Sequence, residues 1–234
     1  LYAGYSEMWS SNNLGTTWSQ LSAIGGGTNV TITEFVISPS STQVIFVIKG
    51  SSIYRTTNGG VSWTNVTGTL PLGSASAQYL CISPTNSNNV WVALSGYSSG
   101  NKVFMTNNGG TSWINYSSNL PNIPANCVLY QPGSNDMIYV GMDVGVYYRD
   151  NLSTTWTLYN TGLPNVPISE LQISAATPGL LHAATYGRGV WAVSTIVPGT
   201  PPVSSFSVSS SNKCTGTAIT FSDISSNYPN AWSW

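Results

Sequence analysis

The chain has 234 residues with six basic and seven acidic side chains, and only 6% of its residues are charged. A formal net charge of −1, with the basic residues scattered singly, gives no field that would attract nucleic acid or an anionic membrane. Hydrophobic residues make up 41% of the chain, including 9 Trp and 13 Tyr, so a disordered chain is excluded. No apolar run reaches the ~20 residues that a membrane span requires.

One pattern of eight residues recurs along the chain: hydroxyl, any, Asn, any, Gly, any, hydroxyl, Trp. It occupies residues 11–18, 56–63 and 106–113, and residues 149–156 hold a degenerate copy. We call these four segments the Trp turns. Their Trp residues are spaced by 45, 50 and 43 residues, a period typical of propeller blades built from four short strands.

The strands expected around the Trp turns follow the same order in each repeat. The pattern predicts three complete blades, with strands at residues 35–38, 44–48, 53–56 and 63–66; 79–83, 90–94, 103–106 and 113–116; and 127–130, 137–140, 146–149 and 156–159. A period near two, β-branched and aromatic residues, and turn residues at each break all favour strands. No stretch has a helical period.

The two ends of the repeat region are expected to hold partial blades. Residues 1–21 supply only later strands, whereas residues 168–193 supply only the first three strands of another blade. We therefore expect residues 1–195 to be an incomplete propeller with further blades upstream of Leu1. Residues 196–203 contain three prolines and predict a stiff linker. Residues 204–234 predict the first strands of a truncated immunoglobulin-like sandwich.

The residue types of the Trp turns are explained by turn closure and packing. Asn can hydrogen-bond the backbone two residues on, Gly accepts a positive φ, and Trp can pack against the neighbouring blade. The residues assigned to this structural role are Asn13, Gly15, Trp18, Asn58, Gly60, Trp63, Asn108, Gly110, Trp113, Asn151 and Trp156.

The Trp turns resemble the Asp-box of BNR-repeat propellers, a superfamily that includes sialidases, xyloglucanase-like glycoside hydrolases and sortilin-type receptors. The family's third-position Asp is Asn in every copy here, and the fourth copy has Ser153 in place of Gly. Residues 186–191 resemble the closing segment of such propellers in large secreted bacterial proteins. Phe206, residues 221–223 and residues 232–234 resemble the start of a PKD domain, an immunoglobulin-like module. The resemblance implies a secreted protein or one at the bacterial cell surface.

In this superfamily, known enzymes bind ligands on the face opposite the Asp-box turns. The residues expected on that face as a ligand-binding surface are Glu7, Lys49, Tyr97, Lys102, Asp143, Tyr186 and Arg188. With Glu34 and Glu170, seven of the eleven charged residues of the propeller region fall toward it. Either polar groups gather there to orient a ligand, or charges simply prefer loops.

Catalytic chemistry has only one candidate pair. Glycoside hydrolysis requires two carboxylates, and Asp143 and Glu170 are the best available. A sialidase is not favoured, because that family gathers three Arg on the substrate and only Arg188 lies on the expected face. His182 and three dispersed Cys predict no metal site, and no cofactor is expected. Cys81 and Cys127 are expected to be buried thiols, whereas Cys214 lies elsewhere.

The leading hypothesis is a secreted or surface-attached modular protein whose propeller binds a glycan or an extracellular protein, or spaces other modules, without catalysis in this segment. Its other expected partners are upstream blades and downstream modules of the same chain, and neither nucleic acid nor a membrane span is expected. One alternative is part of a BNR-type glycoside hydrolase. Another is a structural repeat of a surface filament or adhesin.

Overall fold

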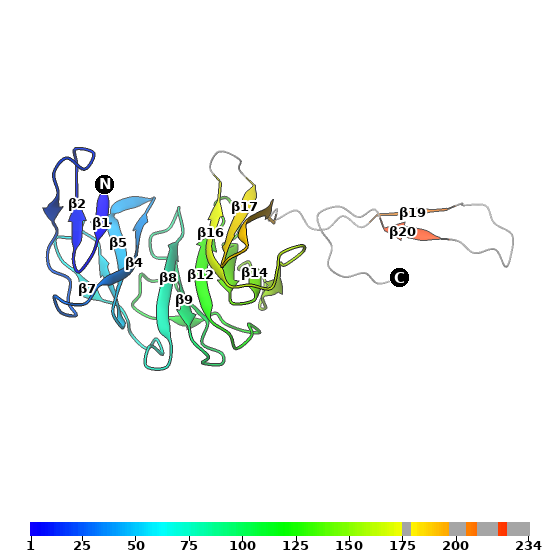
Figure 1. Ribbon diagram of the computed structural model, residues 1–234, viewed down its shortest axis with the longest axis horizontal. Helices are drawn as coiled ribbons and strands as arrows, with labels where there is room; N and C mark the ends of the chain where they lie inside the picture. The colour runs from blue at the N-terminus through cyan, green and yellow to red at the C-terminus, as the bar shows by residue number, and fades with distance from the viewer. Residues whose placement is uncertain (175–178, 197–204, 210–219, 224–234) are drawn as a thin grey trace. The chain divides into compact units, whose positions relative to one another are not determined.

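The computed structural model describes residues 1–174, 179–196, 205–209 and 220–223 (Figure 1). The chain divides into two compact units, Leu1–Thr195 and Ile196–Trp234. Every regular element among the described residues is a β-strand, which confirms the predicted all-β fold class. Among them, no helix is long and apolar enough to cross a membrane.

The first unit consists of five antiparallel sheets, which we number as blades 1 to 5 in chain order. Blade 1 contains β1 (Tyr2–Gly4), β2 (Met8–Ser10) and β3 (Ser19–Gln20). Blade 2 contains β4 (Ile32–Ser38), β5 (Ser41–Lys49), β6 (Ser52–Thr56) and β7 (Thr64–Asn65). Blade 3 contains β8 (Ser76–Ile82), β9 (Val90–Ser95), β10 (Val103–Thr106) and β11 (Ile114–Asn115).

Blade 4 contains β12 (Ala125–Tyr130), β13 (Ile138–Met142), β14 (Gly145–Arg149) and β15 (Thr157–Leu158). Blade 5 contains β16 (Ile168–Ile173), β17 (Leu180–Thr185) and β18 (Gly189–Ser194). Each blade is a simple meander, and the three predicted four-stranded blades are present. Their fourth strands are shorter than predicted, because ladder pairing starts at the residue after Trp.

The second unit is described only as a hairpin of β19 (Phe206–Val208) and β20 (Phe221–Asp223). The rings of Phe206 and Phe221 lie 5.7 Å apart. The linker predicted at residues 196–203, the remaining strands predicted for this unit, and Cys214 lie almost entirely outside the described residues.

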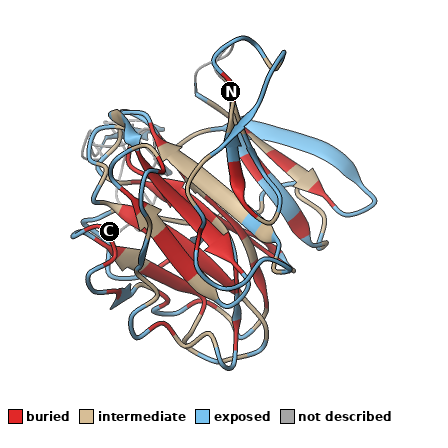
Figure 2. Cartoon of the chain, turned by 90° about the vertical axis from the view of Figure 1, so that its left-hand side faces the viewer, coloured by how far each residue is buried: buried red, intermediate tan, exposed pale blue. Residues whose placement is uncertain are grey.

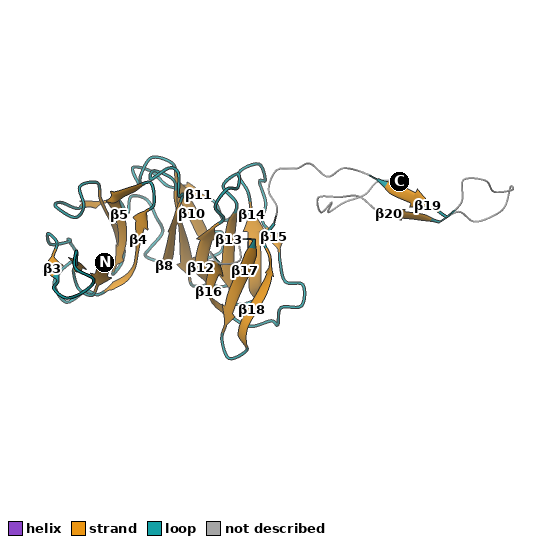
Figure 3. Cartoon of the chain, turned by 90° about the horizontal axis from the view of Figure 1, so that it is seen from above, coloured by secondary structure: helices purple, strands orange, loops and turns teal. Residues whose placement is uncertain are grey.

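The first strands of successive blades lie beside one another in the order β4, β8, β12, β16, as Figures 1 and 3 show. The second strands of the three complete blades, β5, β9 and β13, are buried on both sides (buried residues are red in Figure 2), whereas only alternate residues of β17 are buried. In β5, Ile45 and Val47 enter the core shared with blade 1, whereas Phe46 and Ile48 enter the core shared with blade 3. Successive side chains of a strand point to opposite faces of the sheet, so one strand contributes to two hydrophobic cores.

Strand β9 repeats this arrangement between blades 3 and 4. Val90, Val92 and Leu94 pack toward blade 2, and Trp91 and Ala93 pack toward blade 4. Two-sided burial explains why the second strands read as nearly continuous apolar runs. Cys81 and Cys127 are free and buried in these layers, as predicted. Burial raises the pKa of both thiols, that of Cys127 to about 12, which keeps both protonated.

The Trp turn at residues 56–63 is closed by the side chains of Thr56 and Asn58. Thr56 Oγ1 donates to Asn58 Oδ1 at 2.8 Å and accepts from the amide of Gly60 at 3.0 Å. Asn58 Oδ1 also accepts from the amide of Ser62 at 3.0 Å, and Asn58 Nδ2 donates to Ser62 Oγ at 2.9 Å. Asn thus serves as acceptor and donor, which makes it a workable substitute for the family's Asp.

The same side-chain bonds close the turns at residues 11–18 and 106–113. The fourth turn differs from the sequence prediction. There Asp150, not Asn151, accepts the turn amide, from Ser153 at 2.8 Å. The amide of Asn151 donates to Asn135 O, as the amide of Gly59 does to Gln43 O, so the fourth turn is shifted by one residue.

The Trp indoles join each blade to the one before it. Trp63, Trp113 and Trp156 donate from Nε1 to the carbonyls of Ser22, Val66 and Tyr116, at 3.2, 2.8 and 2.7 Å. The turn glycines approach the same segments closely. A Cβ on Gly60 would meet Leu21 Cδ1 at 2.5 Å, and Gly60 has a φ of +89°, so this position requires glycine twice over.

We expect Trp156→Ala to lower the free energy of unfolding by about 3–5 kcal/mol, because it removes a buried indole and its hydrogen bond. Trp18→Ala is the matched control, since Trp18 has the same place in its turn but is 40% exposed. Chemical denaturation measures both. Equal losses in the two variants would contradict the role assigned to the blade-to-blade contact.

Candidate ligand-binding face

The hairpins between the second and third strands of the blades lie at the end of each sheet opposite its Trp turn, because the strands are antiparallel. Trp turns of neighbouring blades pack on a common side, as the contacts of Gly60 and Gly110 with the preceding blade show. The hairpins β1–β2, β5–β6, β9–β10, β13–β14 and β17–β18 therefore share the other side. We call that side, with the adjoining starts of β4, β8, β12 and β16, the hairpin face.

All four first strands carry a β-bulge at the same point near the hairpin face. The extra residue is polar in every blade: Thr33, Gln78, Asn126 and Ser169. A bulge re-aims side chains and interrupts the ladder, and bulges are common beside functional sites. The repeated bulges thus give the hairpin face a polar centre, which no sequence signal had indicated.

The residues that follow these bulges are Glu34, Tyr79, Cys127 and Glu170, and they influence one another electrostatically. Burial, with a smaller contribution from the charge of Glu170, raises the pKa of Glu34 to about 7. Burial and the charges of both glutamates raise the pKa of Tyr79 to about 12. Carboxyl groups from blades 2 and 5 thus belong to one electrostatic environment.

Two of the charged residues predicted for ligand binding are engaged in an internal ion pair instead. Lys49 is 1% exposed, and its Nζ lies 2.8 Å from Glu7 Oε1. Glu7 Oε2 accepts from the amide of Ile24 at 2.7 Å, and Lys49 also donates to the carbonyl of Ile24. The three residues form a buried network between blades 1 and 2. The charges of Glu7 and Lys49 therefore compensate each other without a ligand.

Lys102 is also buried, and Nζ donates to Gly96 O at 2.6 Å. Burial lowers the pKa of this ammonium group. Asp143 is half-buried, and its Oδ1 accepts from Nδ2 of the bulge residue Asn126 at 3.0 Å. The carboxyl group on which the charge of Glu170 acts is that of Glu34. The pairing of Asp143 with Glu170 for catalysis stays a prediction. His182 lies half-buried within β17, opposite Gln172 and Ala192.

Three hairpins of the hairpin face each expose a tyrosine. Tyr97 is 71% exposed and Tyr186 is 78% exposed, and Arg188 follows Tyr186 in the same hairpin. The hairpin β1–β2 adds Tyr5, which is 72% exposed and was not among the predicted residues. Its equivalence to Tyr97 and Tyr186 could have been found by aligning the hairpins rather than the Trp turns.

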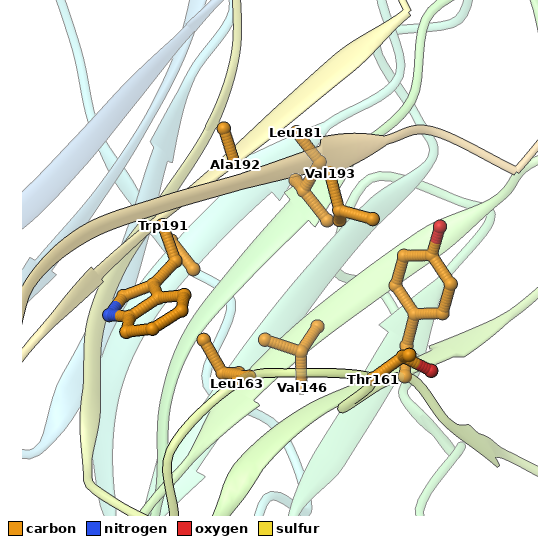
Figure 4. A pocket seen from close by; sticks show the side chains of 9 residues that line it. Val146, Thr161, Leu163, Leu181, Trp191, Ala192 and Val193 are labelled. Atoms are coloured by element: carbon orange, nitrogen blue, oxygen red, sulfur yellow. The ribbon is translucent and has the colours of Figure 1, made fainter.

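An apolar hollow between blades 4 and 5 is not a suitable ligand site (Figure 4). Val146 and Leu163 line it from blade 4 and the segment that follows, and Leu181, Trp191 and Val193 line it from blade 5. Its volume of about 50 Å³ is far below the several hundred Å³ of usual ligand pockets. Among the described residues, no cluster of His, Cys, Asp or Glu could hold a metal ion.

Comparison with known proteins identifies the propeller type. The Sortilin-Vps10 family model, described as sortilin, neurotensin receptor 3, matches residues 6–166. No curated protein matches the chain.

Solved structures support the fold. An ancestral GH74 enzyme has a TM-score of 0.59 at 21% identity, with 79% of this chain and 25% of that chain covered. The GH74 xyloglucanase from Xanthomonas campestris has a TM-score of 0.63 at 14% identity, and the match covers 82% of this chain and 33% of that chain. The extracellular domain of a putative one-component system from B. thetaiotaomicron has a TM-score of 0.59 at 14% identity, and the match covers 85% of this chain and 26% of that chain. The chain thus spans a quarter to a third of each of these proteins.

We expect Lys49→Met to cost about 3–5 kcal/mol of unfolding free energy, because it leaves the Glu7 carboxylate buried without its partner. The double variant Glu7→Leu, Lys49→Met should recover part of this loss. Arg188→Gln, which removes an exposed charge, should change the stability by about 0.5 kcal/mol or less. A Lys49→Met loss no larger than that of Arg188→Gln in urea denaturation would show that the pair does not stabilise the fold.

The raised pKa of Glu34 predicts a pH dependence of stability. The folded state binds this proton more tightly than the unfolded state, whose Glu titrates near 4.5. The stabilisation from protonated Glu34 is therefore complete below pH 4.5 and is lost as the pH rises through about 7. Glu34→Gln should be more stable relative to wild type at pH 8 than at pH 5. Parallel pH profiles of unfolding for the two proteins would contradict this assignment.

Proposed function

This chain belongs to the Sortilin-Vps10 family of β-propellers, and from that premise we propose that it is a glycan-binding module of a secreted or cell-surface protein. The ligand lies on the hairpin face, where the three exposed tyrosines Tyr5, Tyr97 and Tyr186 provide stacking surfaces. This observation carries the proposal, because an exposed Tyr ring offers both an apolar face for stacking on a sugar and a hydroxyl for hydrogen bonding.

Polar groups on the same face would orient the ligand. The bulge residues Gln78 and Asn126 supply amide groups, and Arg188 supplies an exposed cation beside Tyr186. Aromatic rings flanked by a few convergent polar groups are the usual composition of a ligand site. An extracellular protein ligand would use the same surface and is an outcome of the experiment below.

The extracellular location is part of the proposal. It is supported by the likeness to the extracellular domain of the B. thetaiotaomicron protein and by the polar, charge-poor composition. We further propose that the second unit begins a PKD-like spacer, for which the β19–β20 hairpin with its paired Phe rings is the supporting observation.

A second function, glycoside hydrolysis, is favoured by the carboxyl pair Glu34 and Glu170. A carboxyl group whose pKa burial raises to about 7 has the property that an acid catalyst requires, and Glu170 is the carboxyl group that acts electrostatically on it. The GH74 likeness is consistent with it, but the chain covers only part of those enzymes. Release of reducing sugar from xyloglucan, lost in both Glu34→Gln and Glu170→Gln, would support hydrolysis. If the wild-type protein releases no reducing sugar, the hydrolysis hypothesis is ruled out.

A glycan array followed by titration with the best ligand tests the binding function. We expect Tyr97→Ala and Tyr186→Ala each to weaken binding by about tenfold. Val61→Ser is the matched control, because Val61 is 74% exposed but lies on a Trp turn at the opposite end of its blade. An array without glycan hits, or equal binding by the tyrosine variants and wild type, would overturn the proposal.

A further inference from the structure

A polar hollow of about 270 Å³ lies between the second and third Trp turns, on the side opposite the hairpin face. It is lined from blade 2 and the residue that follows its last strand by Arg55, Thr57, Ser62, Thr64 and Val66, and from blade 3 by Gly109 and Thr111. Most of its lining is therefore hydroxyl groups, with one cation. Neither the predicted ligand-binding residues nor the proposed function involves this hollow.

Arg55 is a cation without an anionic partner. Its Nη2 donates to Asn88 Oδ1 at 3.0 Å, whereas its Nε is buried and has no acceptor. The ion pair formed within the described residues joins Glu7 and Lys49, and does not include Arg55. Burial lowers the pKa of the Arg55 guanidinium, which shows that its surroundings disfavour the charge. An anion placed in the hollow would lie beside this guanidinium group and would favour its charged form.

Arg149 shows how an arginine beside a Trp turn is satisfied internally. Its guanidinium lies 3.7 Å from the centre of the Tyr116 ring, and it donates to the carbonyls of Ser153 and Tyr116. Arg55 lies farther from a ring, 5.5 Å from Phe46, and bonds one amide oxygen. The two arginines therefore differ in what is left for a ligand to bind.

Glycine at position 109 of the third Trp turn leaves room for the guanidinium group of Arg55. A Cβ on Gly109 would collide with Nη1 of Arg55, and Gly109 has a φ of +68°. Among the hydroxyls, Ser62 and Thr111 bond within their own turns. The hydroxyls of Thr57 and Thr64 take no part in those turn bonds and are the donors that a ligand would use.

We propose that this hollow binds a single oxyanion group, such as a sulfate or a sugar carboxylate. The planar guanidinium of Arg55 would pair with two of its oxygens, and Thr57 and Thr64 would donate to it. The hollow suits one small anionic group rather than a polymer surface. An acidic glycan could supply that group as a carboxylate or as a sulfate ester, and these two sources are separate arms of the test.

The test is a ¹H–¹⁵N NMR titration of the wild-type protein with sodium sulfate and, separately, sodium glucuronate, each against sodium chloride at matched ionic strength. Binding is expected to shift the amide signals of Thr57 and Gly109 until saturation. Arg55→Gln should weaken it by about tenfold or more, and Arg55→Lys by less, because Lys keeps the charge but not the fork. Thr57→Val and Thr64→Val, which leave Arg55 intact, should weaken it several-fold.

Arg149→Gln is the matched control, since it removes an arginine beside a Trp turn whose guanidinium is already satisfied. The same spectra report whether each variant is folded. A shift by sulfate alone assigns the hollow to a sulfate ester, and a shift by glucuronate assigns it to carboxylates. The proposal is overturned if neither anion shifts these amides beyond the chloride control, or if Arg55→Gln binds as wild type does.

Discussion

The structure depends on the two-sided burial of the second strands of the three complete blades, β5, β9 and β13. In β5 and β9, alternate side chains enter different cores, so neither sheet can be stable without a neighbour on each side. This requirement explains the sequence of these strands and the close stacking of the blades. It also leaves the ends of the strands, rather than their faces, as the places where sequence can vary for function.

The two ends of the blades have different tasks as a result. At one end, each Trp turn joins its own blade to the preceding one through an indole hydrogen bond and a close glycine contact. Substitution there would disturb packing. At the other end, the side chains of Tyr97 and Tyr186 are exposed at the tips of hairpins. Exposed side chains of this kind can change with little effect on stability, which is the usual condition of a binding surface.

The sequence predicted the architecture well because the Trp turns repeat in register. Asn58 and Trp63 have one structural role that their spacing reveals. The fourth turn was harder to predict, because Asp150 takes the place expected of Asn151 and lies one residue farther from its Trp than Asn58 does. Side-chain partners across blades were not predictable. Glu7 and Lys49 are far apart in sequence, and only their packing shows that they neutralise each other. Bulges likewise depend on strand register.

In a chain with so few charges, the position of each one follows from what surrounds it. Glu7 and Lys49 are buried and paired, so they stabilise the interface of blades 1 and 2. Glu34 is largely withdrawn from water without a cation, and its proton substitutes for a partner up to about pH 7. Arg55 cannot lose its proton at any ordinary pH, so it cannot become neutral as Glu34 does. A buried carboxyl can thus become neutral, whereas the guanidinium of Arg55 keeps its charge and would be stabilised by an anion in the proposed site.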